Sequence, residues 1–257
     1  MTTGGTTEAA ALAAIGAATR ELHLPTVRDQ AKPLAEAAQR SRSSHLSYLA
    51  DVLAAETDDR AERRRLRRIK EARFPRPKSL VEFDITASVL SAQTIALLAS
   101  ASYLDKGEPV VLLGDSGTGK SHLLIGLGTA ACEKGHSVRY VTAAQLVNEL
   151  AEAADERRLS RLVARYGRLE LLAIDELGYV KLDLRGAELL FQILTEREER
   201  SSVAVASNLP FSEWGQVVTD ARLVAAIVDR LTFRAHIIET GTESYRLRAA
   251  RKGRPRQ

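Results

Sequence analysis

The chain has 257 residues, enough for one large hydrophobic core or for one core and a small accessory domain. Its composition, 45% hydrophobic and 27% charged, is that of a globular protein, and no apolar run approaches membrane-spanning length, which excludes an integral membrane protein. The single cysteine, Cys132, excludes an internal disulfide, and the N-terminus lacks the features of a signal peptide. We therefore expect a cytoplasmic protein with no membrane partner.

Positive charge is concentrated in two short stretches. The formal net charge is +4, but residues 60–73 contain eight basic and two acidic side chains, and residues 246–257 contain six basic side chains and no acid. The remainder of the chain is acidic overall. Such clustering on an otherwise acidic protein indicates a polyanionic partner.

The first 75 residues predict a helical region. Residues 1–20 are rich in Thr, Gly and Ala, and we expect them to be frayed or disordered. Apolar residues at helical spacing predict one helix from Pro25 and a second from about 46 to 73. The expected apolar side of the second helix consists of Leu46, Leu49, Leu53, Leu66 and Ile69. Residues 21–75 would form an N-terminal helical domain that is too small to be stable alone and should dock on another surface or pack between subunits.

The second predicted helix carries the first basic stretch. Its candidate DNA-binding residues are Arg60, Arg63, Arg64, Arg65, Arg67, Arg68, Lys70 and Arg73. One interpretation is a solvated helix face with a few i,i+4 ion pairs, such as those of Glu62 with nearby arginines. Because only two acids lie within the stretch, we favour contact with the phosphates of duplex DNA.

A proline-containing segment, Phe74-Pro75-Arg76-Pro77, ends the second helix, since proline disfavours the helical conformation of the residue before it. We place a domain boundary here. Residues 76–245 would form the second domain, and residues 246–257 a basic tail that could contact DNA or be disordered. The first elements of the second domain are expected to be an entry segment at 80–84, a helix at about 91–103 and a strand at 110–113.

The residues after that strand, Gly114-Asp115-Ser116-Gly117-Thr118-Gly119-Lys120-Ser121, fit the pattern G-x-x-x-x-G-K-[ST]. A helix is expected to follow from Ser121 to Lys134, with Gly135 beyond its end. In such a loop, backbone N–H groups point at a phosphate and the helix N-terminus adds partial positive charge. We expect Lys120 to reach the β- and γ-phosphates and the Ser121 hydroxyl to bind Mg²⁺. A chance match in a glycine turn is the alternative, and the strand–loop–helix context argues against it.

Strands alternate with helices in the rest of the chain. The expected strands cover residues 137–141, 169–176, 202–206 and 235–239, and the expected helices cover residues 143–153, 156–166, 184–200 and 223–232. This alternation predicts an α/β fold with a parallel sheet flanked by helices on both faces. The nucleotide should lie beyond the carboxyl ends of the strands.

One predicted strand ends in two carboxylates, Asp175 and Glu176. At the carboxyl edge of a sheet that carries a phosphate loop, we expect Asp175 to hold the water shell of Mg²⁺ and Glu176 to activate the attacking water. Two further residues stay open at this point. Asn208 could contact the γ-phosphate or form a turn before Leu209, and Arg230 is either a surface ion-pair residue or an arginine finger.

Together these motifs resemble the IstB family, ATP-binding helpers of insertion-sequence transposition that are related to the DnaC helicase loader and the DnaA initiator within the AAA+ group. The resemblance extends from Leu24 onward. It rests on Leu24–Arg28, Tyr48-Leu49, Arg73–Pro75, Gly114–His122, Ile174–Glu176, Ser207-Asn208, Asp229–Leu231 and Ser244–Leu247. It implies an AAA+ P-loop ATPase domain preceded by a small N-terminal helical domain.

The resemblance also implies roles for individual residues. Asn208 would be sensor 1, Arg230 is similar to the finger that reaches a neighbouring subunit's ATP, and Arg246 resembles a second sensor. The implied nucleotide-binding residues are Gly114, Asp115, Ser116, Gly117, Thr118, Gly119, Lys120, Ser121, His122 and Arg246. By the same analogy, ATP and Mg²⁺ drive assembly of a homo-oligomer on duplex DNA, which recruits and stimulates an IstA-type transposase, and hydrolysis permits release.

Three other functions share parts of this pattern. A DnaC-like helicase loader would have the same ATPase site but would prefer single-stranded DNA and a helicase partner. A small-molecule kinase would need an acceptor pocket and no basic arms. A DNA-binding module with a vestigial nucleotide site would have no use for Glu176. The basic helix and the intact carboxylates favour the transposition helper.

Overall fold

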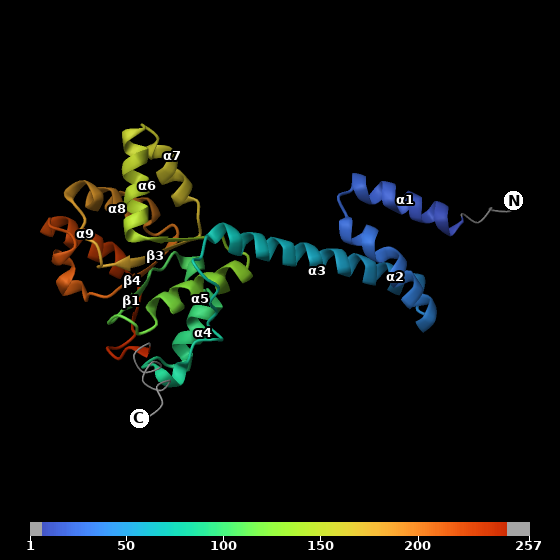
Figure 1. Ribbon diagram of the computed structural model, residues 1–257, viewed down its shortest axis with the longest axis horizontal. Helices are drawn as coiled ribbons and strands as arrows, with labels where there is room; N and C mark the ends of the chain where they lie inside the picture. Colours follow the sequence, from blue (N-terminus) through green and yellow to red (C-terminus); the bar gives the residue numbers. More distant parts are fainter. Residues whose placement is uncertain (1–6, 246–257) are drawn as a thin grey trace, which may run out of the picture. The chain divides into compact units, whose positions relative to one another are not determined.

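The computed structural model describes residues 7–245, except for the side chain of Ala87. The chain divides into two compact units, one through Leu66 and one from Arg67 (Figure 1). This division falls inside the helix α3, whereas the sequence places the domain boundary just after the end of that helix. Arg246 and the predicted basic tail, residues 246–257, lie outside the described residues.

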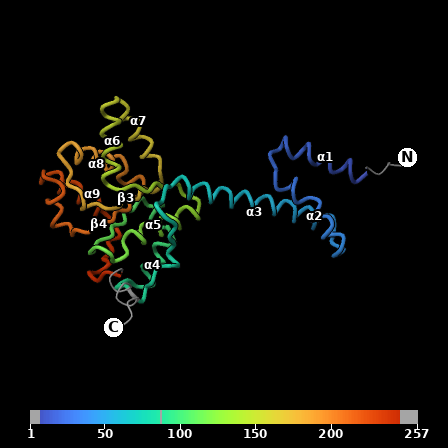
Figure 2. Tube along the Cα trace, in the orientation of Figure 1, coloured from blue at the N-terminus to red at the C-terminus, as the bar shows by residue number. Residues whose placement is uncertain are grey.

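The first unit consists of α1 (Glu8–Glu21), α2 (Pro25–Ser41) and most of α3 (His45–Ala72). Figure 2 traces the path of the chain through these helices. We expected residues 1–20 to be frayed or disordered; residues 1–6 lie outside the described residues, but Glu8–Glu21 form the regular helix α1. Alanine has the highest helix propensity, and the Thr7 side chain caps the helix by accepting a hydrogen bond from the Ala10 N–H at 3.4 Å. The helices predicted from Pro25 and from about 46 to 73 are confirmed.

A buried carboxylate joins the start of α2 to α3. Glu56 is 4% exposed and accepts hydrogen bonds from the N–H groups of Thr26 at 2.9 Å and Val27 at 3.1 Å. These N–H groups have no acceptor within their own helix, so Glu56 caps α2 from the neighbouring helix. Burial acts to raise the pKa of Glu56, but the hydrogen bonds from Val27, Arg60 and Thr26 outweigh it and lower the pKa overall.

The face of α3 that packs on α2 differs from the predicted one. It consists of Tyr48, Val52 and Glu56, which lie four residues apart, and the Tyr48 hydroxyl donates a hydrogen bond to the Ala31 carbonyl at 3.0 Å. The leucines expected to form the apolar side are exposed, with Leu46 at 78%. The polar capping contact of Glu56 therefore selects the face, and the leucine spacing does not.

The second unit is built on a five-stranded parallel sheet. Its strands are β1 (Val110–Leu113), β2 (Val138–Thr142), β3 (Leu171–Leu177), β4 (Ser202–Ser207) and β5 (His236–Glu239). They lie in the order β2-β3-β4-β1-β5, and every neighbouring pair is parallel. The strand β1, which leads to the predicted phosphate loop, therefore lies between two neighbours, with Val110 opposite both Ala204 and His236. The predicted fold class is confirmed.

Side chains of β1 alternate between two hydrophobic cores, one on each face of the sheet. Val110 and Leu112 belong to the core with α4 and α5, and Val111 and Leu113 to the core with the later helices. The helices of this unit are α4 (Ala92–Ser100), α5 (Lys120–Glu133), α6 (Ala143–Asp155), α7 (Leu159–Gly167), α8 (Leu184–Arg197) and α9 (Ala221–Thr232). Cys132 is fully buried in the first core, as expected for a packing residue.

Short 3-10 helices and the end of α3 complete the second unit. The 3-10 helices are η1 (Ile85–Ala87), η2 (Leu104–Lys106) and η3 (Phe211–Gln216). Ala72 is fully buried in the core that contains α5, so the last turn of α3 packs on the sheet domain. Among residues 7–245, no helix combines the length and the apolarity that crossing a bilayer requires.

Candidate nucleotide-binding site

The predicted phosphate loop joins β1 to α5, and its conformation depends on glycine. Gly114, Gly117 and Gly119 have φ angles of 146°, 86° and 101°, in the left-handed region that other residues rarely adopt. Lys120 opens α5 and is 7% exposed. Its Nζ donates hydrogen bonds to the carbonyl oxygens of Gly114 at 2.6 Å and Asp115 at 2.7 Å. The ammonium group is therefore held against the loop.

The chain segment after β5 supports this loop. The Asp115 N–H donates to the Gly241 carbonyl at 3.1 Å, and the Tyr245 N–H donates to the Gly117 carbonyl at 3.0 Å. Thr118 Oγ1 and Thr240 Oγ1 share a buried hydrogen bond of 2.6 Å. Sequence reasoning assigned no role to Gly241 or Thr240, because they contact the loop from more than a hundred residues away.

Two neutral groups hold the predicted metal-binding carboxylate. Asp175 lies near the end of β3 and is 3% exposed. The Tyr140 hydroxyl donates to its Oδ2 at 2.6 Å, and the Glu176 N–H donates to its Oδ1 at 2.8 Å. Burial, followed by the hydrogen bond to Asp175, raises the pKa of Tyr140, so the hydroxyl stays a donor. Sequence reasoning missed Tyr140, although β2 is the neighbour of β3 in the sheet.

A β-bulge presents Glu176 to the pocket. The register between β3 and β4 shifts between Ile174 and Leu177, and Glu176 has a φ of 63°, in the left-handed region that glutamate seldom adopts. Its side chain is exposed, although its neighbours Asp175 and Leu177 are buried. The bulge interrupts the alternation of the strand at the residue predicted to activate water.

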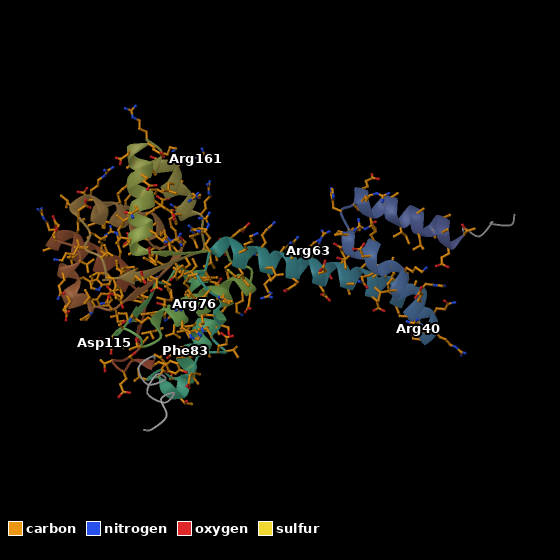
Figure 3. All side chains as sticks on the ribbon, viewed as in Figure 1. Arg40, Arg63, Arg76, Phe83, Asp115 and Arg161 are labelled. Atoms are coloured by element: carbon orange, nitrogen blue, oxygen red, sulfur yellow. The ribbon has the colours of Figure 1, made fainter. Side chains whose placement is uncertain are left out.

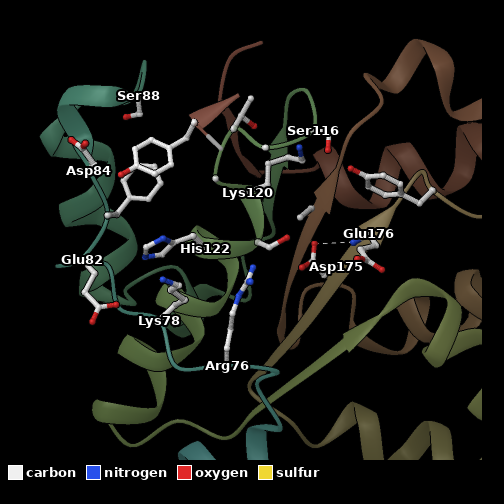
Figure 4. Close-up of a pocket in the computed structure, with 18 residues that line it drawn as sticks. Arg76, Lys78, Glu82, Asp84, Ser88, Ser116, Lys120, His122, Asp175 and Glu176 are labelled. Carbon is white, nitrogen blue, oxygen red and sulfur yellow. Dashed lines mark hydrogen bonds between the residues drawn. The ribbon is translucent and has the colours of Figure 1, made fainter. Parts of the chain in front are cut away.

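One pocket of about 510 Å³ brings the predicted groups together. Its lining includes Lys120, Ser121, Asp175 and Glu176. Figure 4 shows Asp175 and Glu176 side by side, with the hydrogen bond from the Glu176 N–H to the Asp175 carboxylate as a dashed line. The Ser121 hydroxyl and the Asp175 carboxylate are oxygen ligands of the kind that Mg²⁺ prefers, so the residues present fit a magnesium ion.

The pocket also contains residues that sequence reasoning did not assign. Arg76, Lys78, Phe83 and Tyr245 line it together with the loop residues Ser116 to Gly119. Their signal in the sequence is the proline-containing segment and the Ser244-Tyr245 motif, but local patterns give neither segment a role. Only the folded structure shows that both segments reach the loop.

His122, which the family resemblance places with the nucleotide-binding residues, lines the same pocket. Its ring lies edge-on to Phe83, with 5.4 Å between the ring centroids, and its Nε2 is 2.9 Å from the Ser79 carbonyl oxygen. Burial lowers the pKa of His122, so the neutral ring is favoured and donates to Ser79. The imidazole therefore fastens the segment before the loop to α5.

Asn208 lies just after β4. It is not among the residues that line the pocket, and its buried Oδ1 has no hydrogen-bond partner among the described residues. A Cβ added at Gly178, which follows β3, would come within 2.5 Å of that oxygen. Asn208 therefore lies against the turn that follows Glu176, and its predicted catalytic role stays a prediction.

Arg230 lies away from the phosphate loop. It occupies the last turn of α9 and lines a second pocket with Pro109 and Val203, where β1 and β4 begin. Its Nε is 3.3 Å from a carboxylate oxygen of Glu198, and its guanidinium stacks 4.2 Å from the centre of the Phe191 ring. The phosphate loop follows the carboxyl end of β1. Arg230 and the loop therefore lie at opposite ends of the strands.

Carboxylates pair with half of the basic residues predicted to bind DNA. The ion pairs are Arg60 with Glu56 at 3.0 Å, Arg63 with Asp59 at 3.0 Å, Arg65 with Glu62 at 2.7 Å and Arg67 with Glu71 at 3.8 Å. Figure 3 labels Arg63 in this stretch of α3. We expected only two acids to be available, but Glu56 and Asp59 lie just before the stretch and reach it at helical spacing. For Arg64, Arg68, Lys70 and Arg73, no carboxylate among the described residues lies within 4.0 Å.

Comparison with known proteins gives one family for the chain. The profile of the IstB-like ATP binding protein family matches residues 17–253. A putative insertion sequence ATP-binding protein of Sinorhizobium fredii is 36% identical over 250 residues, covering 95% of this chain and 84% of the relative. The putative ATP-binding protein of insertion sequence IS5376 from Geobacillus stearothermophilus is 36% identical over 231 residues, covering 90% of this chain and 92% of the relative.

Solved structures share the fold at low sequence identity. One of them is the replication initiator DnaA bound to AMPPCP and single-stranded DNA, which matches with a TM-score of 0.55 at 20% identity. The match covers 70% of this chain and 55% of the DnaA chain, so it spans little more than half of DnaA. The DnaC helicase loader matches with a TM-score of 0.50 at 18% identity, over 63% of this chain and 96% of DnaC. The fold is thus of the AAA+ type, and with the matches above, the chain belongs to the IstB-like family of insertion-sequence ATP-binding proteins.

Proposed function

We propose that this protein is an ATPase whose nucleotide state controls its assembly on duplex DNA, and that the assembly recruits and stimulates the transposase of an insertion sequence. The observation that carries the proposal is the presence of Lys120, Ser121, Asp175 and Glu176 in one pocket. Nucleotide binding alone has no need of Glu176, whereas hydrolysis needs a group that activates water.

Each of these groups has a role in the attack of water on the γ-phosphate. The loop N–H groups and the N-terminus of α5 bind the phosphates, and Lys120 offsets the charge that develops on them. Ser121 and Asp175 would hold Mg²⁺, which when bound neutralises phosphate charge and orients the terminal phosphate. Glu176 orients the water and accepts its proton, and Tyr140 keeps the Asp175 carboxylate in place.

The position of Arg230 supports a role for it in a neighbouring protomer's site. Within its own protomer, Arg230 lies near the amino ends of the strands, whereas the phosphate loop lies at their carboxyl ends. Contact with a second copy would exchange the Glu198 carboxylate for the terminal phosphate of that copy's ATP. Hydrolysis would then require assembly, and an isolated monomer would be a poor ATPase.

The basic residues of α3 support duplex DNA as the polyanion. Arg64, Arg68, Lys70 and Arg73, which have no ion pair among residues 7–245, can contact phosphates without breaking one. The names of the relatives associate them with insertion sequences, which supports a transposase as the protein partner. These relatives are 36% identical, and they favour this partner over a helicase, because the helicase loader DnaC is only 18% identical.

The variant Glu176→Gln tests the proposal, because it keeps the size and hydrogen bonding of the side chain but removes the base. We expect ATP binding close to wild type, hydrolysis lowered by about a hundredfold or more, and an oligomer that stays on duplex DNA. Phosphate release and sedimentation with and without a DNA duplex measure these effects. Glu188→Gln, an exposed position on α8 outside the pocket, is the matched control.

Two outcomes would contradict the proposal. Hydrolysis by Glu176→Gln at the wild-type rate would show that another group activates water. Equal binding of wild-type protein to duplex DNA with and without ATP, in the same stoichiometry, would show that nucleotide does not control assembly.

A further inference from the structure

Residues Phe74 to Phe83 follow α3 and lie along α5. Side chains of this segment occupy space that is open because glycines of α5, and the glycine just before it, have no side chain. A Cβ added at Gly128, Gly126 or Gly119 would come within 2.9 Å of a side-chain atom of Phe74, Leu80 or Phe83, respectively. The three contacts run from the end of α5 to its start as the segment proceeds. The segment therefore leads from the last turn of α3 to the phosphate loop.

Polar contacts hold the same segment in place. The Thr129 hydroxyl donates to the Lys78 carbonyl at 3.1 Å, and the His122 ring bonds the Ser79 carbonyl. Pro75 and Pro77 fix their own φ angles and restrict the residues before them, including Arg76. Movement of this segment at one end would therefore be transmitted to the other.

Arg76 and Lys78 extend from this segment into the nucleotide pocket. In Figure 4 the Arg76 side chain points into the space between His122 and Asp175. No carboxylate among the described residues lies within 4.0 Å of Arg76, although Asp175 and Glu176 line the same pocket. Arg76 therefore lies at the carboxylate end of the pocket.

That end of the pocket is where the terminal phosphate of ATP has to lie, because Glu176 must reach the attacking water. A guanidinium forms paired hydrogen bonds with phosphate oxygens and has few other partners that match its geometry. ADP has no phosphate at this position. A cation here therefore distinguishes ATP from ADP.

We propose that Arg76 binds the terminal phosphate of ATP within its own protomer and that the Phe74–Phe83 segment thereby links ATP binding to the last turn of α3. The proposal rests on the proposed ATP-binding function. Arg76 would contact bound ATP but not bound ADP. The conformation of the last turn of α3, which carries the basic residues Arg68, Lys70 and Arg73, would then differ between the two states.

The test compares the affinities of full-length protein for fluorescent ATP and ADP analogues. We expect Arg76→Ala to weaken ATP binding about tenfold and to leave ADP binding within about twofold of wild type. Arg76→Lys should be intermediate, because lysine supplies a point charge without paired donors. Arg161→Ala, which removes the same charge from an exposed position on α7, is the control.

Hydrogen exchange of residues 67–73 provides the second readout. Wild type should show a difference between its ATP-bound and ADP-bound states in this turn, and Arg76→Ala, saturated with either nucleotide, should show none. Unchanged ATP affinity in Arg76→Ala, or an equal loss for ATP and ADP, would overturn the inference. If wild type binds neither nucleotide, the proposed function itself fails.

Discussion

The nucleotide pocket and α3 are both rich in charge, but the two regions hold their charges in different ways. At the nucleotide pocket, neutral groups donate to or accept from two charged side chains. Backbone carbonyls bind Lys120, and a hydroxyl and an N–H group bind Asp175. On α3, carboxylates of the same helix pair with arginines such as Arg60 and Arg65. At Asp175 the negative charge stays available for a cation, whereas the pairing on α3 neutralises charge within the helix.

The difference shows how to interpret a cluster of charge. A buried charge that is oriented by neutral hydrogen bonds implies that an opposite charge arrives from outside, since desolvating it would otherwise be unfavourable. A surface charge paired at helical spacing contributes little to stability and little net potential. In α3, only the residues without a carboxylate partner carry the argument for DNA.

The largest expected effect is at the loop. Lys120→Ala removes the ammonium that offsets phosphate charge, and we expect affinity for ATP to fall by about a hundredfold or more. Isothermal titration with ATP and Mg²⁺ measures the change. A fold intact by circular dichroism would show that the loss is local, and near-normal affinity would mean that this loop does not bind phosphate in the proposed way.

The next effect separates the two kinds of arginine on α3. We expect Arg64→Ala with Arg68→Ala to weaken duplex DNA binding about tenfold at physiological salt. The slope of log affinity against log salt concentration should become shallower by about 2, because two phosphate contacts are lost. Arg65→Ala with Arg67→Ala removes the same charge from paired positions and should change both quantities less. Equal effects of the two double variants would show that paired and unpaired arginines of α3 do not differ in DNA binding.

A smaller effect is expected at Tyr140. Tyr140→Phe removes the 2.6 Å hydrogen bond to Asp175 without changing the shape of the core. We expect kcat/KM for ATP to fall about fivefold and half-maximal activity to need more Mg²⁺, because the carboxylate is less well oriented. Titration of Mg²⁺ at saturating ATP separates this from a loss of stability. A fall in melting temperature with an unchanged Mg²⁺ requirement would contradict a positioning role.

The smallest effect concerns Glu56 and pH. Its folded-state pKa is lowered, so the ionised carboxylate stabilises the first unit above the unfolded-state pKa, and this contribution is lost as pH falls through the lower folded-state value. We expect the Thr26 and Val27 amides to lose protection from hydrogen exchange over that acidic range, after correction for intrinsic rates. In Glu56→Gln, protection should be lower at neutral pH and should vary less with pH. Identical profiles would exclude Glu56 as the cap of α2.

Local sequence rules were sufficient for the strands and helices of the second unit. The apolar run Val110–Leu113 and the glycines after it determine their own conformation, so the loop could be placed without knowledge of its surroundings. Contacts between distant segments could not be derived in this way. Tyr140 reaches Asp175 across the sheet, and Thr240 reaches the loop from the far end of the chain.

The errors on α3 and α1 have a different origin. Counting acids only within the basic stretch overlooked Asp59, which reaches Arg63 from one turn earlier. Leucine spacing suggested a packing face, but the buried hydrogen bonds of Glu56 select another. Glycine and threonine at the N-terminus suggested disorder through residue 20, yet a threonine cap, a run of alanines and packing against α2 accompany the helix from Glu8.

The support that the phosphate loop receives from Gly241 and Tyr245 has a consequence for biosynthesis. A ribosome makes the loop long before it makes β5 and the residues after it, and domains generally fold once their chain has emerged. A nascent chain that stops before residue 245 has a loop without these backbone hydrogen bonds. Tight binding of ATP would therefore begin only after residue 245 has been made, and truncation before that residue would leave the loop without this support.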